Sequence, residues 1–135
     1  MNWPDYYILV GRTPVAVDVL TWGKWFGTAK ERFIAETIID DTPVEHTYGM
    51  LPGREKKYMR PKIRVSTVFL GLNSSFRPGE PMLFETMIFG GSLDGEQWRY
   101  ATYDQAERGH ADAVVQARKA AAQIKALADE AGAKK

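Results

Sequence analysis

Three apolar segments joined by short polar connections fill much of the second half of the chain, and they restrict its fold more than any other feature. The segments cover residues 65–72, 82–89 and 97–103, and the connections between them are rich in Gly, Pro and Ser. Short connections of this kind join neighbouring antiparallel strands, whereas parallel strands need long crossovers. The pattern therefore predicts an antiparallel meander.

The N-terminal half predicts a hairpin, a short helix and one more strand. Residues 6–10 and 15–17 are β-prone and flank a turn that contains glycine and proline. Asp18 is a suitable N-cap for a helix that ends at Gly27. One face of this helix is expected to be aromatic, with Trp22, Trp25 and Phe26. Residues 32–39 alternate in part between apolar and polar side chains, which predicts a strand.

Residues 40–62 show no clear period and contain three prolines and two glycines, so we expect an irregular loop. The last element is a long helix that starts at a capping box made by Thr102 and Gln105. Its apolar stripe is rich in alanine and comprises Ala106, His110, Ala113, Val114, Ala117, Ala121, Ile124 and Ala128. We therefore expect one α+β domain over residues 1–131, with this helix laid on one face of the sheet, and a frayed tail over 132–135.

Composition excludes several classes of function. The chain has 135 residues, a formal net charge of +1 and no cysteine. Without cysteine there is no disulfide, no catalytic thiol and no Cys-based metal centre. The small net charge argues against a general binder of duplex nucleic acid. No apolar run is long enough to cross a membrane, and residues 1–5 do not resemble a signal peptide. We expect a soluble, cytoplasmic protein.

Motifs for catalysis and metal binding are missing from the sequence. It contains no GxGxxG, GxxxxGK[ST], HExxH or GxSxG pattern. A zinc site would have to combine His46 and His110 with scattered carboxylates. A lone histidine on an apolar helical stripe, such as His110, is more often a structural group than a base. We therefore expect a protein that is not an enzyme and that uses no cofactor or metal.

Polar residues inside the predicted strands are the first candidates for a binding site. Glu85 and Thr86 interrupt an apolar strand, and the alternation of a strand places them on opposite faces. A buried carboxylate is costly unless it is paired or solvated. Glu85 therefore faces water, pairs with Arg64 or Arg99, or accepts hydrogen bonds from a ligand such as the amine of a base.

Two loop segments are further candidates. Residues 54–64 contain six basic side chains, and Tyr48 and Tyr58 lie close to them in the sequence. Such a segment is either a solvated loop or a site where cations bind phosphates and tyrosines stack on bases. Phe76 and Arg77 occupy a turn rich in proline and glycine, where a bulky aromatic residue favours a contact role.

A series of short motifs along nearly the whole chain occurs in the same order in a known family. The most specific are residues 65–73 (VSTVFLGLN) and 83–91 (LFETMIFGG). They are accompanied by 7–9, 13–15, Trp22 with 25–26, Pro81, 99–100 with Thr102, and Ala106 with 109–110. This set resembles a widespread family of small proteins of tailed bacteriophages and prophages, most of which have no assigned activity. The basic insertion before Ile63 and the longer C-terminal helix depart from the family pattern.

The resemblance implies a role against host defence. Phages encode small oligomeric sponges, including the anti-CBASS type, that sequester cyclic oligonucleotide or cyclic ADP-ribose signals without catalysis. Such a site needs arginines for phosphates, aromatic rings for bases and polar groups for base edges. We therefore expect a homo-oligomer in the host cytoplasm that sequesters a cyclic nucleotide. The expected ligand-binding residues are Trp22, Arg64, Thr67, Glu85, Thr86, Arg99 and Tyr100, with Phe76 and Arg77 as loop contacts.

Other functions remain open at this point. The main alternative is a non-enzymatic phage accessory protein that contacts a host or phage protein through the aromatic helix and the loop around Phe76 and Arg77. A third hypothesis is an accessory protein that binds nucleic acid through the basic segment. A hydrolase of the signal is disfavoured because the sequence offers no pair of a base and a nucleophile.

Overall fold

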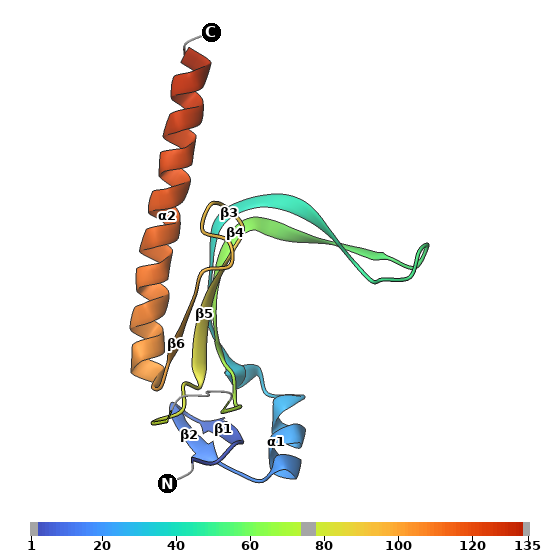
Figure 1. The fold of residues 1–135 in the computed structure, drawn as a ribbon, viewed down its shortest axis with the longest axis vertical. Helices are drawn as coiled ribbons and strands as arrows, with labels where there is room; N and C mark the ends of the chain where they lie inside the picture. The colour runs from blue at the N-terminus through green and yellow to red at the C-terminus, as the bar shows by residue number, and fades with distance from the viewer. Residues whose placement is uncertain (1–2, 74–77, 134–135) are drawn as a thin grey trace.

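The computed structural model describes residues 3–73 and 78–133 and has the expected α+β fold (Figure 1). An antiparallel N-terminal hairpin, a short helix, a four-stranded antiparallel sheet and a long C-terminal helix follow one another. The elements are β1 (Tyr7–Val10), β2 (Thr13–Ala16), α1 (Val19–Phe26), a 3-10 turn η1 (Lys30–Arg32), β3 (Phe33–Tyr48), β4 (Lys56–Phe69), β5 (Phe84–Phe89), β6 (Gln97–Tyr100) and α2 (Tyr103–Ala133). Helix α2 packs against the sheet (Figure 1).

The large sheet is a meander in which each strand pairs with the next along the chain. Its order is β3-β4-β5-β6, and every neighbouring pair is antiparallel. Hairpin β1–β2 forms a separate two-stranded sheet, which a bridge between Tyr6 and Leu72 connects to the rest of the fold. The predicted meander is therefore confirmed, and its short connections are the physical reason.

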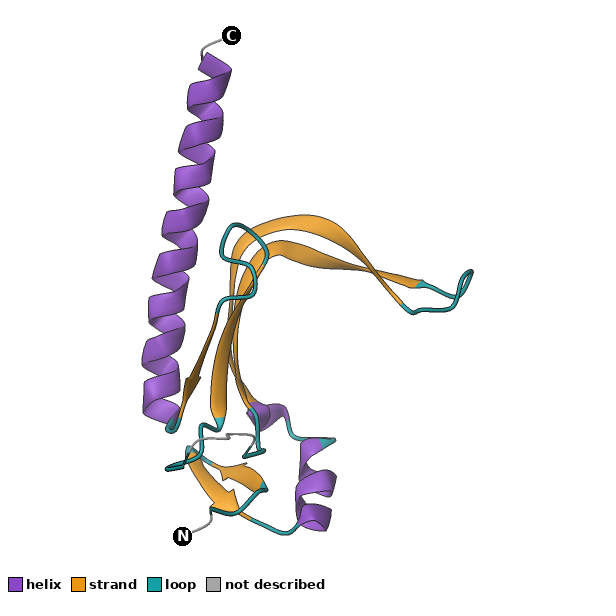
Figure 2. Ribbon diagram, viewed as in Figure 1, coloured by secondary structure: helices purple, strands orange, loops and turns teal. Residues whose placement is uncertain are grey.

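The prediction of an irregular loop over residues 40–62 is wrong. Strands β3 and β4 continue through this segment as a paired ribbon, with Val44 opposite Arg60 and His46 opposite Tyr58. We call residues 43–61 of this ribbon the arm; it leaves the body and curves away from α2 (Figure 2). Pro43 lies opposite Pro61. Each strand of a two-stranded ribbon has a free edge, which tolerates a residue without an N–H.

Both helices begin at the predicted caps. In α1 the Asp18 carboxylate accepts a hydrogen bond from the Thr21 N–H at 2.8 Å. In α2 the Gln105 N–H donates to Thr102 Oγ1 at 3.2 Å, while the Gln105 side-chain oxygen accepts from the Thr102 N–H. Helix α2 runs to Ala133, so the tail expected to fray from residue 132 is helical for two more residues. Residues 134 and 135 lie outside the described part.

The core has two centres, one at each end of the contact between α2 and the sheet. The first joins the hairpin to the sheet and includes Leu9, Phe69 and Phe84. The second lies farther along α2 and includes Val65 and Ile88 of the sheet with Ala113 and Ala117 of the helix. The small residues of α2 let the helix approach the strands closely. At Gly109 an added Cβ would lie 2.0 Å from the Tyr100 hydroxyl, so glycine is needed where this ring meets the helix.

Candidate functional site

The sheet separates the residues expected to bind a ligand into two groups. Thr67 and Thr86 are fully buried on the face that α2 covers, which we call the covered face. Arg64, Glu85 and Arg99 lie on the opposite face, which we call the open face, because side chains alternate along each strand. One ligand therefore does not contact both groups.

A chain of hydrogen bonds occupies the middle of the covered face. His110 of α2 bonds Thr67 Oγ1 through Nδ1 at 2.7 Å and Thr37 Oγ1 through Nε2 at 2.8 Å. Thr67 Oγ1 lies 2.6 Å from Thr86 Oγ1, so the network spans β3, β4, β5 and α2. Burial lowers the pKa of His110 from its ordinary value. Thr67 and Thr86 therefore satisfy polar groups between the helix and the sheet, and their expected contact with a ligand stays a prediction.

Glu85 and Arg99 form an ion pair on the open face. The two residues lie opposite each other in neighbouring strands, and Arg99 Nε donates to Glu85 Oε2 at 3.0 Å. The Glu85 side chain is only 13% exposed, whereas that of Arg99 is 41% exposed. Of the explanations open for Glu85, pairing with a neighbouring arginine is confirmed. The pair offsets the cost of a carboxylate in an otherwise apolar strand.

Arg64 lies one strand away in a more enclosed position. Its guanidinium group is 3.9 Å from the centre of the Phe89 ring, and Nη1 is 3.8 Å from Glu36 Oε2. The Arg64 side chain is 13% exposed, and its Nε has no hydrogen-bond partner among the described residues. Burial lowers the pKa of Arg64 from its ordinary value. The side chain is therefore a largely desolvated cation held against an aromatic ring.

The remaining expected site residues are not brought to the arginines. Trp22 stacks on Phe26 with ring centres 4.8 Å apart and contacts Tyr6 at 5.4 Å, so it packs between α1 and the N-terminal segment. Tyr100 is partly buried against the first core cluster. Phe76 and Arg77 lie outside the described residues, so their expected role as loop contacts stays a prediction.

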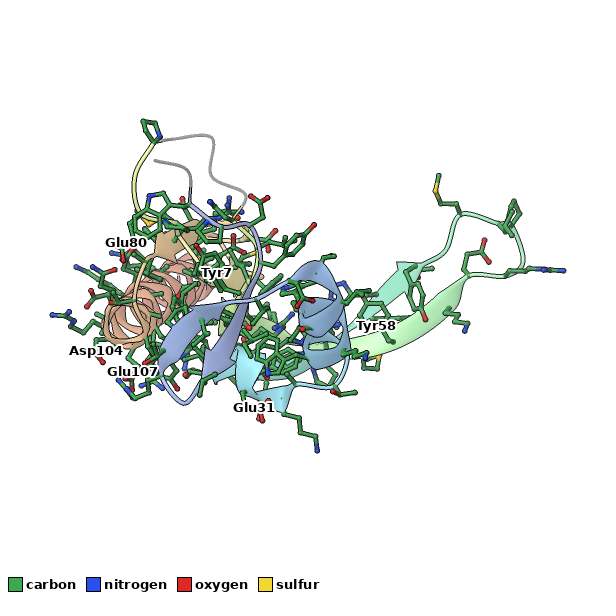
Figure 3. The ribbon with its side chains drawn as sticks, turned by 90° about the horizontal axis from the view of Figure 1, so that it is seen from below. Tyr7, Glu31, Tyr58, Glu80, Asp104 and Glu107 are labelled. Atoms are coloured by element: carbon green, nitrogen blue, oxygen red, sulfur yellow. The ribbon has the colours of Figure 1, made fainter. Side chains whose placement is uncertain are left out.

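The arm is the exposed feature that the sequence reasoning missed. Figure 3 shows it extending to one side of the molecule, with Tyr58 far from α2. Tyr58 stacks on His46 at 5.4 Å and meets Tyr48 edge-on at 5.6 Å, and the Arg60 guanidinium lies 5.0 Å from the Tyr58 ring centre. The sequence signal for the arm is weak, because Val44, His46 and Tyr48 alternate with polar residues but form no buried apolar face.

A groove of about 1160 Å³ opens between the C-terminal half of α2 and the end of the sheet. Its walls are mainly apolar and include Ile39, Ile63, Leu93 and Ile124. Charged side chains also line it, namely Asp40, Asp41, Lys62 and Lys125. Helix α2 continues beyond the strands at this point (Figure 2), and its residues 122–133 are exposed.

The search for metal ligands and the comparison with known proteins give no further indication of function. Within residues 3–73 and 78–133, no three His, Asp or Glu side chains come together in a way that could hold a metal ion. The same residues contain no helix with the length and hydropathy needed to span a membrane. Comparison of the chain with models of protein families, with curated proteins and with solved structures gives no match.

Proposed function

We propose that this protein acts without catalysis, by contacting another protein through the β3–β4 arm. The observation that supports this proposal is the set of exposed apolar side chains on the arm, two of them at its tip and one nearer its base. Met50 is 99% exposed, Leu51 62% and Met59 61%. Apolar groups gathered on a projecting segment mark a surface that a partner covers. A two-stranded ribbon is only marginally stable alone, so such a partner would also order the arm.

The charges of the arm indicate the chemistry of its partner. Residues 44–60 contain four basic and two acidic side chains. Two of these charges already pair with each other within the arm, since Lys57 Nζ lies 3.4 Å from Glu45 Oε1. The best fit is a protein surface with an apolar pocket and an acidic rim. The motifs resemble those of a phage family, and on this basis we propose that the partner is a host or phage protein in the host cytoplasm.

Negative charges introduced at the tip of the arm by substitution are expected to weaken capture of the partner strongly. We expect Met50→Asp combined with Leu51→Asp to lower recovery of the partner by about tenfold or more, as for the loss of interface anchors. Both side chains are exposed, so the thermal stability should stay within about 0.5 kcal/mol of the wild type. The measurement is affinity capture of the tagged chain from infected host cells, followed by quantitative mass spectrometry.

The matched control is Val115→Asp, which places a charge on a residue of α2 that is 65% exposed and is not part of the arm. It should capture the same partner as the wild type. Recovery of the same proteins, in the same amounts, by the arm variant and the wild type would contradict the proposal.

A second candidate function is sequestration of a cyclic nucleotide on the open face. The observation that favours it is the pair of arginines, Arg64 and Arg99, two strands apart on the same uncovered face. Phe89 lies against Arg64, and guanidinium groups are the usual partners of phosphate oxygens. The proposed site is thus smaller than the one expected from the sequence, because Thr67 and Thr86 are not part of it.

A ligand of this site should raise the melting temperature by several degrees. A ligand at 100 times its Kd stabilises a protein by about 2.7 kcal/mol. We expect one cyclic di- or trinucleotide, or a cyclic ADP-ribose isomer, to give this shift, and we expect Arg64→Ala and Arg99→Ala to remove it. Arg108→Ala on α2 is the control that should keep it. A flat thermal-shift screen at millimolar concentrations would exclude this candidate and leave the protein partner.

A further inference from the structure

The apolar stripe of α2 is covered by the sheet for only half of its length. Ala106, His110, Ala113 and Ala117 are buried against the strands, but residues 122–133 are all exposed. Ile124 is 54% exposed and Leu127 62%. An apolar stripe that continues past its contact surface is expected to meet another surface.

We propose that a second copy of this chain provides that surface, by packing the C-terminal half of its own α2 antiparallel to this one along the groove. This inference does not depend on the function proposed for the arm. The groove already has the required character, because Ile39, Ile63 and Leu93 form its wall opposite Ile124. A helix that enters it contacts both the neighbouring helix and the end of the sheet.

The spacing of the stripe fits a two-helix seam. Residues 117, 121, 124, 128 and 131 are all Ala or Ile, and the steps between them alternate between four and three, as in a heptad pattern. In an antiparallel pair with its two-fold axis at Ile124, the two Ile124 side chains meet. Ala121 then faces Ala128 of the other copy. The same surface is used on both copies, as a two-fold dimer requires.

Charge complementarity favours the antiparallel orientation. The half-helix begins with Arg118 and Lys119 and ends with Asp129 and Glu130. Antiparallel packing places the basic start of one half-helix beside the acidic end of the other, whereas parallel packing places like charges side by side. Antiparallel helix dipoles also oppose each other favourably.

The size of the surface is consistent with a dimer. The half-helix over residues 118–133 is about 24 Å long at 1.5 Å per residue. Alanine in the seam allows the helix axes to approach to about 8 Å. A stable interface usually buries about 1200–2000 Å² in total, which requires the groove walls as well as the helices. The arm of the same chain curves away from α2, which forms one wall of the groove (Figure 2).

The oligomeric state tests the proposal directly. We expect the wild-type chain to sediment as a dimer in analytical ultracentrifugation at micromolar concentrations, and Ile124→Asp to raise the dimer Kd by about 100-fold or more, because two carboxylates would meet at the axis. Val115→Asp, on the same helix but not among the groove residues, should remain dimeric. A wild-type chain that is monomeric up to millimolar concentration, or a dimer unaffected by Ile124→Asp, overturns the proposal.

The orientation is tested by disulfide trapping, which is simple in a chain without cysteine. Ala121→Cys and Ala128→Cys chains, mixed and oxidised, should form a mixed disulfide dimer, while each alone should stay largely uncrosslinked. The reverse result, with each variant crosslinking to itself, would indicate a parallel pair and overturn the antiparallel arrangement. Circular dichroism of each variant checks that the helix is retained.

Discussion

Gly90→Ala is expected to destabilise the protein by about 3 kcal/mol or more. Gly90 has a φ of +88°, where a residue with a side chain is strained, and an added Cβ would lie 1.7 Å from the backbone carbonyl oxygen of Lys62. That oxygen belongs to β4, so relief of the overlap requires the strand or the β5–β6 loop to move. Gly90 and Lys62 both line the groove, so the same displacement should weaken the proposed dimer.

The control for this prediction is Gly95→Ala in the same loop. Gly95 has a φ of +86°, but an added Cβ would meet nothing within 4 Å. Gly95→Ala should therefore lower the free energy of unfolding only by the strain of a side chain at positive φ, about 1–2 kcal/mol. Urea unfolding of both variants separates the two contributions. Equal losses for Gly90→Ala and Gly95→Ala would mean that the contact with Lys62 is not important.

Elements with strong local signals were predictable from the sequence. The caps at Asp18 and Thr102, the alternation around Glu85 and the short polar turns each depend on neighbouring residues alone, and the structure confirms them. The sequence predicted for Glu85 only a set of alternatives, namely water, Arg64, Arg99 or a ligand, because a carboxylate in an apolar strand requires a partner or water. The structure shows the pair with Arg99.

The arm was not predictable by the same reasoning. Recognition of a strand from periodicity requires one apolar face, and residues 43–48 and 56–60 are exposed on nearly all sides. The prolines and glycines of residues 40–62 then favour a loop. What decides the structure is cross-strand pairing, including His46 with Tyr58 and Val44 with Arg60, between residues more than ten positions apart.

The candidate site was predictable only in part, because a strand pattern gives two faces but not which of them a helix covers. Thr67 and Arg64 both belong to β4, yet the first is buried under α2 and the second faces away from it. The stripe of α2 contained the missing information. His110 interrupts an apolar stripe, and its two ring nitrogens require polar partners on the surface it covers, which are Thr37 and Thr67.

His110→Ala is expected to lower the free energy of unfolding by about 2–4 kcal/mol. The change removes the imidazole that bonds Thr37 and Thr67 and leaves a cavity between α2 and the sheet. Thr67 keeps Thr86 as a partner, whereas the Thr37 hydroxyl loses the bond to the ring. Equilibrium unfolding in urea at pH 7 measures the loss.

The same residue should make stability depend on pH. Burial lowers the pKa of His110 in the folded protein, so below the unfolded value of about 6.5 the unfolded chain binds the proton more readily than the folded protein. The contribution of His110 to the free energy of unfolding is then constant with pH above about 6.5. It falls as the pH decreases below that value, by at most about 1.36 kcal/mol per pH unit. His110→Ala should lack this dependence between pH 7 and pH 5.

The chain provides a matched control in His46, its other histidine, which lies on the exposed arm. His46→Ala should keep both the stability and the pH dependence of the wild type, because His46 lies on the exposed arm, where its ring stacks on Tyr58. A pH dependence that survives in His110→Ala but is lost in His46→Ala would contradict the structural role of His110. The pH dependence of stability would then not originate from the buried His110.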